Sequence, residues 1–123
     1  MKQQTIESDA ETAIAHAKQL GADQAAVSVS SGKGFSVKAQ NGLIETVEHY
    51  EDQTFGITVF VKQSKGSAST NNLSKNSLLK TTEKALSLAN LTAADEFNGL
   101  ADSNLMATEP IDLDLHHPWK LDM

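Results

Sequence analysis

Four histidines are the side chains of this sequence best suited to hold a metal ion or to transfer a proton. They are His16, His49, His116 and His117. None is followed by glutamate, and none has a second histidine four or five residues away, so the spacing of a zinc-binding helix is missing. We interpret His16 as a boundary residue of a helix and His49 as part of a solvated strand face.

A weaker metal candidate lies near the end of the sequence, where Asp114 and His116 would share one face of a short strand. These two side chains could begin a metal site, but the sequence offers no third ligand near them. The favoured alternative is a segment that packs on another domain. The sequence therefore predicts no metal site in this chain.

Two segments, Ser30–Lys33 and Ser77–Lys80, match the pattern Ser-x-x-Lys, which places a lysine one helical turn from a nucleophilic serine. Neither is accompanied by the further motifs that such enzymes need, and chance explains the matches in a chain rich in serine and lysine. Gly32-Lys33-Gly34 lacks the spacing of a phosphate-binding loop and is better explained as a turn. The sequence thus predicts no catalytic residue.

The strand-like segment Gly66-Ser67-Ala68-Ser69-Thr70 has the strongest functional interpretation, because its side chains are all small. Small side chains allow another backbone to come close, and an extended peptide could add there as a further strand. An ordinary edge strand and a contact surface for another domain are the alternatives. We therefore treat these five residues as a possible peptide or domain contact.

Composition limits the classes of function. The chain has 123 residues, a net charge of −6, no cysteine and no arginine. A chain of this length fits one domain, and its acidic balance argues against binding to a nucleic-acid backbone. Without cysteine there is no disulfide or thiolate site. The sequence shows no membrane-spanning helix and no signal peptide, so we expect a cytoplasmic protein.

The elements that must position these residues follow from hydrophobic periodicity. Apolar residues at helical spacing predict a helix over residues 5–20, with Ser8 or Thr5 as its cap and Gly21 as its stop. A second helix is predicted over residues 74–90, with Ser74 as its N-cap.

Between the helices, alternating residues predict about five strands. They span residues 25–31, 35–40, 43–50, 54–61 and 67–70. The predicted turns are Gly32–Gly34, Asn41-Gly42, Glu51–Gln53 and a last one ending at Lys65-Gly66. Asn41-Gly42 is the strongest of them as a hairpin signal.

A two-residue turn at Asn41-Gly42 would place Lys38 opposite Glu45, and Val37 opposite Thr46. Val47 would then lie on the face opposite to Val37. Two interpretations remain open at this point: a strand that twists at a sheet edge, or a strand whose two faces are both partly covered by something outside this chain.

The predicted fold is α+β, an antiparallel sheet of about five strands flanked by two helices, with an irregular C-terminal tail. The helices should pack on the face formed by Phe55, Ile57, Val59 and Val61. We expect one domain over residues 1–91. Residues 92–123 are polar and irregular apart from a possible short strand at residues 111–115, and we expect them to lead to a further domain.

The stretch from Thr54 to Ser74, TFGITVFVKQSKGSASTNNLS, resembles the N-terminal domain of the TldD/PmbA family, in particular its PmbA/TldE branch. The segments Ala26–Ser30 and Asp112–Pro118 add to the resemblance. Because members of the family are several-fold longer, the resemblance implies an N-terminal fragment of a longer protein.

The resemblance also implies a function. In this family a TldD-type subunit carries a His-Glu-x-x-x-His zinc motif, and a PmbA/TldE-type partner lacks it. The complex would cleave unfolded peptides and small proteins, including a peptide antibiotic precursor and an antitoxin. The present chain would then be a non-catalytic domain for assembly or for the substrate path. Its partner would be a TldD-like subunit that holds the zinc, or a second copy of itself.

A protein-binding regulatory or adaptor module is the alternative, consistent with an older association of the family with DNA gyrase. The chain itself would then act without any peptidase role. In both cases its partners would be proteins or peptides rather than nucleic acids or membranes.

Overall fold

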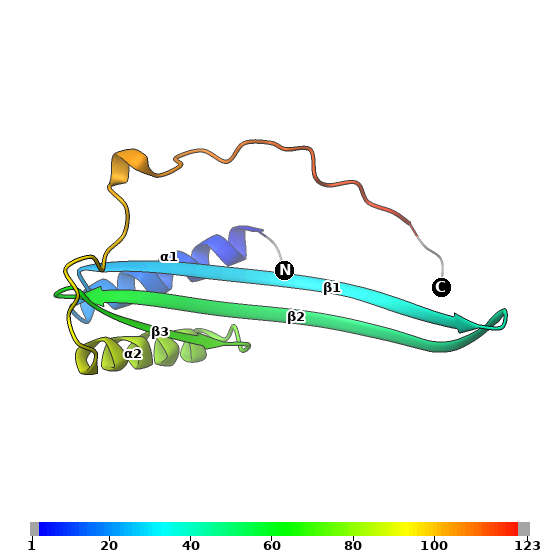
Figure 1. The fold of residues 1–123 in the computed structure, drawn as a ribbon, viewed down its shortest axis with the longest axis horizontal. Coiled ribbons are helices and arrows are strands. Elements are labelled where there is room, and N and C mark those ends of the chain that lie inside the picture. Colours follow the sequence, from blue (N-terminus) through cyan, green and yellow to red (C-terminus); the bar gives the residue numbers. More distant parts are fainter. Residues whose placement is uncertain (1–2, 121–123) are drawn as a thin grey trace.

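The computed structural model describes residues 3–120, which form two helices on one face of a three-stranded antiparallel sheet (Figure 1). The strands lie in the order β1-β2-β3. In chain order the elements are α1 (Gln3–Gln19), β1 (Gln24–Gln40), β2 (Leu43–Val61), β3 (Ser64–Thr70), α2 (Lys75–Leu91) and the short 3-10 helix η1 (Ser103–Leu105).

The α+β class is confirmed, but the prediction of about five strands is wrong because β1 and β2 are each continuous. The predicted turns at Gly32–Gly34 and Glu51–Gln53 do not form. Instead these two segments pair with each other, with Gly32 opposite Asp52. Each looks like a turn in isolation, but a strand can run through glycine when a partner strand supplies the hydrogen bonds.

The hairpin turn at Asn41-Gly42 is confirmed, and both residues have positive φ as a type I′ turn requires. The predicted register beyond it is wrong, because a β-bulge follows between Lys38 and Ala39. Glu45 is left without a partner in the ladder, so Lys38 pairs with Thr46. The extra residue moves Val47 to the same face as Val37.

The next turn lies at Lys62 and Gln63, which both have positive φ, rather than ending at Lys65-Gly66. The Asp23 carboxylate supports it by accepting a hydrogen bond of 2.7 Å from the Lys62 amide. Gly66 therefore belongs to β3, where it pairs with Val59.

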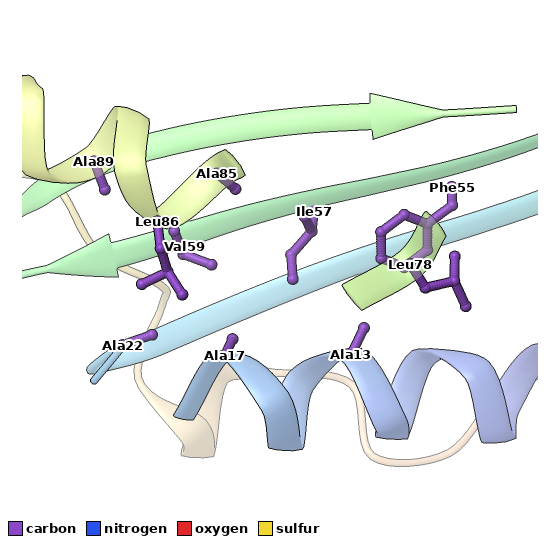
Figure 2. Close-up of a cluster of buried hydrophobic side chains, with 10 residues drawn as sticks. All are labelled: Ala13, Ala17, Ala22, Phe55, Ile57, Val59, Leu78, Ala85, Leu86 and Ala89. Carbon is purple, nitrogen blue, oxygen red and sulfur yellow. The ribbon is translucent and has the colours of Figure 1, made fainter. Parts of the chain in front are cut away.

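The core lies between the two helices and the sheet, as predicted (Figure 2). Phe55, Ile57 and Val59 of β2 are fully or almost fully buried, and Val61 is partly buried. The helix side chains that pack on these strand residues are alanines on α1 and include Leu78 and Leu86 on α2. The buried hydrophobic residues of the helices and their junction are Ala13, Ala17, Ala22, Leu78, Ala85, Leu86 and Ala89.

The ends of the helices follow local sequence rules. Gly21 has φ 103° and ends α1 in a Schellman motif, in which the Ala22 amide donates to the Ala17 carbonyl at 3.0 Å. The predicted caps at Thr5 and Ser8 are wrong, since α1 already includes Gln3. Ser74 is confirmed as the N-cap of α2, where its hydroxyl accepts a hydrogen bond from the Ser77 amide.

The tail after α2 is irregular, as predicted, and runs back past the sheet toward the hairpin turn (Figure 1). The strand predicted at residues 111–115 does not form, and Asp114 interrupts the extended backbone with φ 51°. No helix within residues 3–120 combines the length and the apolar character needed to cross a membrane.

The sheet has two halves of different construction. β3 pairs only with Phe55–Val61 of β2, and beyond Phe55 only β1 and β2 continue. We call this two-stranded part, residues 32–52, the ribbon. It extends away from the helices and ends at the Asn41-Gly42 turn (Figure 1).

Candidate functional site

The five residues predicted as a possible contact site lie on two different faces of β3. Gly66 is buried, Ala68 and Thr70 are half-buried, and all three lie on the face toward the helices. Ser67 and Ser69 are exposed on the opposite, helix-free face. Alternation along a strand explains this division. Only the two serines of the segment are therefore fully available to a partner on the open face.

Gly66 is required by the packing of α2 on β3. A Cβ atom at this position would overlap the Ala85 carbonyl oxygen and the Ala89 backbone nitrogen. The helix backbone thus rests directly on the strand. The small size of Gly66 serves this internal contact rather than an approaching peptide.

The helix-free face carries a shallow groove along the middle of the three strands. Its walls are formed by small residues, among them Ala26, Ser28, Gly56, Thr58, Ser67 and Ser69. The Thr58 and Ser67 hydroxyls are hydrogen-bonded to each other at 2.8 Å. With no large side chain in the way, another backbone could approach this face closely.

One end of this face is closed by the start of the tail. The Leu100 amide donates a hydrogen bond of 2.8 Å to the Gln24 side chain, and the Asp95 amide donates one of 3.0 Å to the Gln63 carbonyl. Phe60, which points to this face, is 8% exposed. The groove is therefore bounded at the Phe60 end and open toward the ribbon.

The histidines do not assemble a metal site. Within residues 3–120, no three histidine or acidic side chains lie close enough together to hold a metal ion. The nearest approach in the tail is His117 Nε2 to Asp114 Oδ2 at 3.8 Å, and both side chains are largely exposed. A catalytic zinc takes three protein ligands, so these residues do not fit one.

His16 and His49 have structural partners. His16 Nε2 lies 3.4 Å from Glu83 Oε1 and links α1 to α2. His49 is on the ribbon, and its ring centre lies 6.2 Å from that of Phe35 on the neighbouring strand. These positions agree with a helix boundary for His16 and an exposed strand for His49.

The structure adds an aromatic site that the sequence did not reveal. Three consecutive cross-strand pairs of the ribbon, Lys33–Glu51, Gly34–Tyr50 and Phe35–His49, line a hollow whose remaining wall is Trp119. The Tyr50 ring lies over Gly34, where a Cβ atom would meet its hydroxyl oxygen at 2.5 Å. Phe35 and Tyr50 lie on two strands that the sequence predicts, over residues 35–40 and 43–50, but the position of Trp119 beside them depends on the tertiary fold.

Comparison with known proteins identifies the domain. Residues 25–89, more than half of the chain, match the family model described as PmbA/TldA metallopeptidase domain 1. This region begins in β1 and ends in α2, so it covers the sheet except Gln24 and most of the helix that rests on Gly66.

Curated relatives agree over most of the chain. The chain is 40% identical over 111 residues to the metalloprotease PmbA homolog of Haemophilus influenzae, which covers 90% of this chain and 24% of that protein. It is also 40% identical over 111 residues to metalloprotease PmbA of Escherichia coli O157:H7, covering 88% of this chain and 25% of that protein. The chain thus spans about a quarter of the length of these relatives.

A solved structure shows the same fold. The crystal structure of TldE from Thermococcus kodakarensis aligns with a TM-score of 0.69 at 16% sequence identity, over 84% of this chain and 23% of that one. One assignment follows from the family model, the PmbA relatives and this shared fold. The chain belongs to the PmbA/TldA metallopeptidase family and carries its first domain, of the PmbA/TldE type.

Proposed function

We propose that this chain is the N-terminal, non-catalytic domain of a PmbA/TldE-like subunit in a cytoplasmic zinc peptidase of the TldD/TldE type. Its role is to assemble the subunits and to line the path of the substrate. The substrates are unfolded peptides and small proteins, such as a peptide antibiotic precursor or an antitoxin. The zinc and the catalytic groups belong to a TldD-like partner.

The observation that carries this proposal is the 40% identity to proteins named metalloprotease PmbA over nearly the whole chain. Because the chain covers only a quarter of those relatives, the activity of the complete proteins comes to it only as a proposal. The side chains of the described residues support a non-catalytic role, since the histidine–carboxylate pairs His16–Glu83 at 3.4 Å and His117–Asp114 at 3.8 Å each offer only two potential ligands.

The helix-free face is the surface through which we expect this domain to act. Its small residues and its open groove suit contact with an extended backbone or with another domain. Ser67 and Ser69 are the two residues of β3 that reach this face, and Ala68 is held in the core contact. Ser67→Lys therefore tests the surface, whereas a change at Ala68 would disturb the packing of α2.

The decisive experiment is purification of the protein from its own cells, followed by metal analysis and a peptide hydrolysis assay. We expect a zinc-containing partner to co-purify and the complex to hydrolyse an unfolded peptide. We expect the 123-residue chain alone to be inactive. Metal-dependent hydrolysis by the chain alone would contradict the proposal.

The alternative is an adaptor that binds a protein partner without any peptidase role. The exposed apolar ribbon is consistent with a protein partner in either case. Recovery of a stable complex that contains neither zinc nor peptidase activity would favour the adaptor.

A further inference from the structure

The tail meets the sheet at two places, one at each end of residues 100–119. At the first, the Leu100 amide donates a hydrogen bond of 2.8 Å to the side chain of Gln24, the first residue of β1. At the second, Trp119 forms one wall of the hollow on the ribbon. Between these points the tail runs along β1 toward the hairpin turn (Figure 1). We call residues 100–119 the strap, because both of its ends lie against the sheet.

The hollow lies on the β1 side of the ribbon, where the strap passes. Tyr50 of β2 pairs with Gly34, and its ring leans across this glycine, where an added Cβ atom would meet the hydroxyl oxygen at 2.5 Å. Covering a glycine of an edge strand with a cross-strand aromatic ring is a recurring device of sheets. Tyr50 remains 56% exposed, so its ring is available to a second side chain.

The end of the strap forms a bend just before Trp119. The Asp114 amide donates a hydrogen bond of 2.9 Å to the Asp112 carboxylate, and His117 Nε2 lies 3.8 Å from Asp114 Oδ2. Pro118 has a fixed φ and directly precedes Trp119. A segment already held by local contacts loses less conformational freedom when its end docks, so the bend favours docking of Trp119.

Charge makes the strap a better occupant of the β1 side than a second copy of the chain. The strap contains four acidic residues and no lysine, whereas β1 contains Lys33 and Lys38 and no acidic residue. If β1 of a second copy approached instead, the same basic residues would lie near one another. Opposite charges therefore favour the strap along this edge.

The contact at the hollow is incomplete in the structure. Trp119 is 81% exposed although it lines the hollow, and Phe35, which lines it as well, is 39% exposed. An indole ring gains free energy both from burial and from contact with another aromatic ring. A movement of the strap toward β1 would provide both gains, so the strap is poised to close.

We propose that the strap closes on the β1 side of the ribbon, with the Trp119 indole packed in the hollow against the Tyr50 ring above Gly34. Closure covers the aromatic residues of the ribbon, so a protein partner reaches them only by displacing the strap. The contact is intramolecular and does not depend on the proposed peptidase function. Trp119 and Tyr50 are the single tryptophan and the single tyrosine of the chain, so both are specific fluorescent probes of it.

The test is acrylamide quenching of Trp119 fluorescence in the 123-residue chain, with energy transfer from Tyr50 as a second readout. We expect the quenching constant to be about three- to tenfold lower in the folded chain than in urea, because an aromatic pair favours the closed state by about this factor. Tyr50→Phe should abolish the energy transfer but keep the low quenching constant, since the ring remains. Equal quenching in the folded chain and in urea would overturn the proposal.

A pair of glycines on β1 locates the contact. Gly34→Ala should raise the quenching constant toward its value in urea, because the added Cβ atom displaces the Tyr50 ring. Gly32→Ala is the matched control on the same strand, where a Cβ atom meets nothing within 4 Å, and it should leave the quenching constant unchanged. Circular dichroism and thermal unfolding show whether each variant keeps the fold. Tyr50→Ser, which leaves β1 unmodified, should release Trp119 as Gly34→Ala does.

A low quenching constant that neither Gly34→Ala nor Tyr50→Ser raises would overturn the proposal, because Trp119 would then be covered elsewhere. So would a quenching constant that falls as the protein concentration rises, since Trp119 would then dock on another copy. The assay contains no peptidase subunit. Purification of the protein from its cells without a zinc-containing partner would therefore refute the proposed function and leave this inference intact.

Discussion

Phe55 and Phe35 lie on the same face of the same pair of strands, in the two halves of the sheet. At Phe55 the sheet is three strands wide and covered by helices, and this side chain is 0% exposed. At Phe35 the sheet is two strands wide, and the side chain is 39% exposed. Between them Ser31 pairs with Gln53 and Lys33 with Glu51, so polar pairs interrupt the apolar face.

The two halves of the sheet differ in what their apolar residues do. In the packed half, apolar residues bury surface against α1 and α2 and stabilise the fold. In the ribbon, Phe35, Val37 and Val47 keep the alternation of a buried face, but no helix lies over them among the described residues. Because a two-stranded ribbon is only marginally stable in water, this alternation is better explained by a partner than by folding of the domain.

The largest difference should appear when the two phenylalanines are truncated. Phe55→Ala removes a fully buried ring and should lower the free energy of unfolding by about 3–5 kcal/mol. Phe35→Ala should lower it by less than about 1 kcal/mol, because the ring is already partly in water. Urea unfolding followed by circular dichroism measures both. Equal losses would mean that the ribbon folds as part of the core.

A pair of glycines tests the packed half alone. Gly66→Ala should destabilise the domain by about 1–3 kcal/mol or more, because its methyl group would meet the backbone of α2. Gly56→Ala is the matched control on the neighbouring strand, where a Cβ atom meets nothing within 4 Å. The control should be neutral or stabilising by about 0.5–1 kcal/mol, since alanine costs less backbone entropy in a strand. Thermal unfolding of both variants would show the contrast, and similar melting temperatures would refute the close contact of β3 with α2.

The start of α2 should contribute a smaller effect. Ser74→Ala removes the hydroxyl that accepts a hydrogen bond from the Ser77 amide at 3.3 Å, and should cost about 1 kcal/mol of unfolding free energy. Ser69→Ala, an exposed serine on β3, serves as the control and should change stability by less than about 0.5 kcal/mol. An effect of Ser74→Ala no larger than that of the control would show that the cap does not support the packed half.

The smallest effect is expected in the ribbon, at the ion pair of Lys38 and Glu45. The two charged groups are 3.4 Å apart and exposed, so Lys38→Gln should change stability by no more than about 0.5 kcal/mol. The difference in unfolding free energy between Lys38→Gln and the unmodified chain should be equally small at low and high salt, as measured by urea denaturation. A large salt-sensitive loss would place the ribbon among the elements that stabilise the fold.

Local sequence signals predicted three element ends correctly. Gly21, Asn41-Gly42 and Ser74 act through their own backbone or side chain, and each lies where the sequence placed it. Gly32–Gly34 and Glu51–Gln53 were misassigned because their composition is typical of turns. Their pairing with each other depends on the register of the whole hairpin, which brings Gly32 opposite Asp52.

The candidate site was predicted only in part for the same reason. The small side chains of β3 were visible in the sequence, but the contact of Gly66 with the backbone of α2 was not. This contact makes Gly66 and Ala68 part of the packing between β3 and α2. Likewise, the hollow beside Tyr50 needs Trp119 from the tail, which no local pattern connects to the ribbon.

The unpaired Glu45 has a consequence for how this hairpin can change in length. Side chains alternate with a period of two, so the single extra residue sets the parity of every position from Thr46 onward. Deletion of Glu45 alone would turn Val47 away from Val37, or would force a compensating shift elsewhere. Related hairpins that keep their two faces should therefore differ from this one by even numbers of residues per strand, unless they gain or lose a bulge.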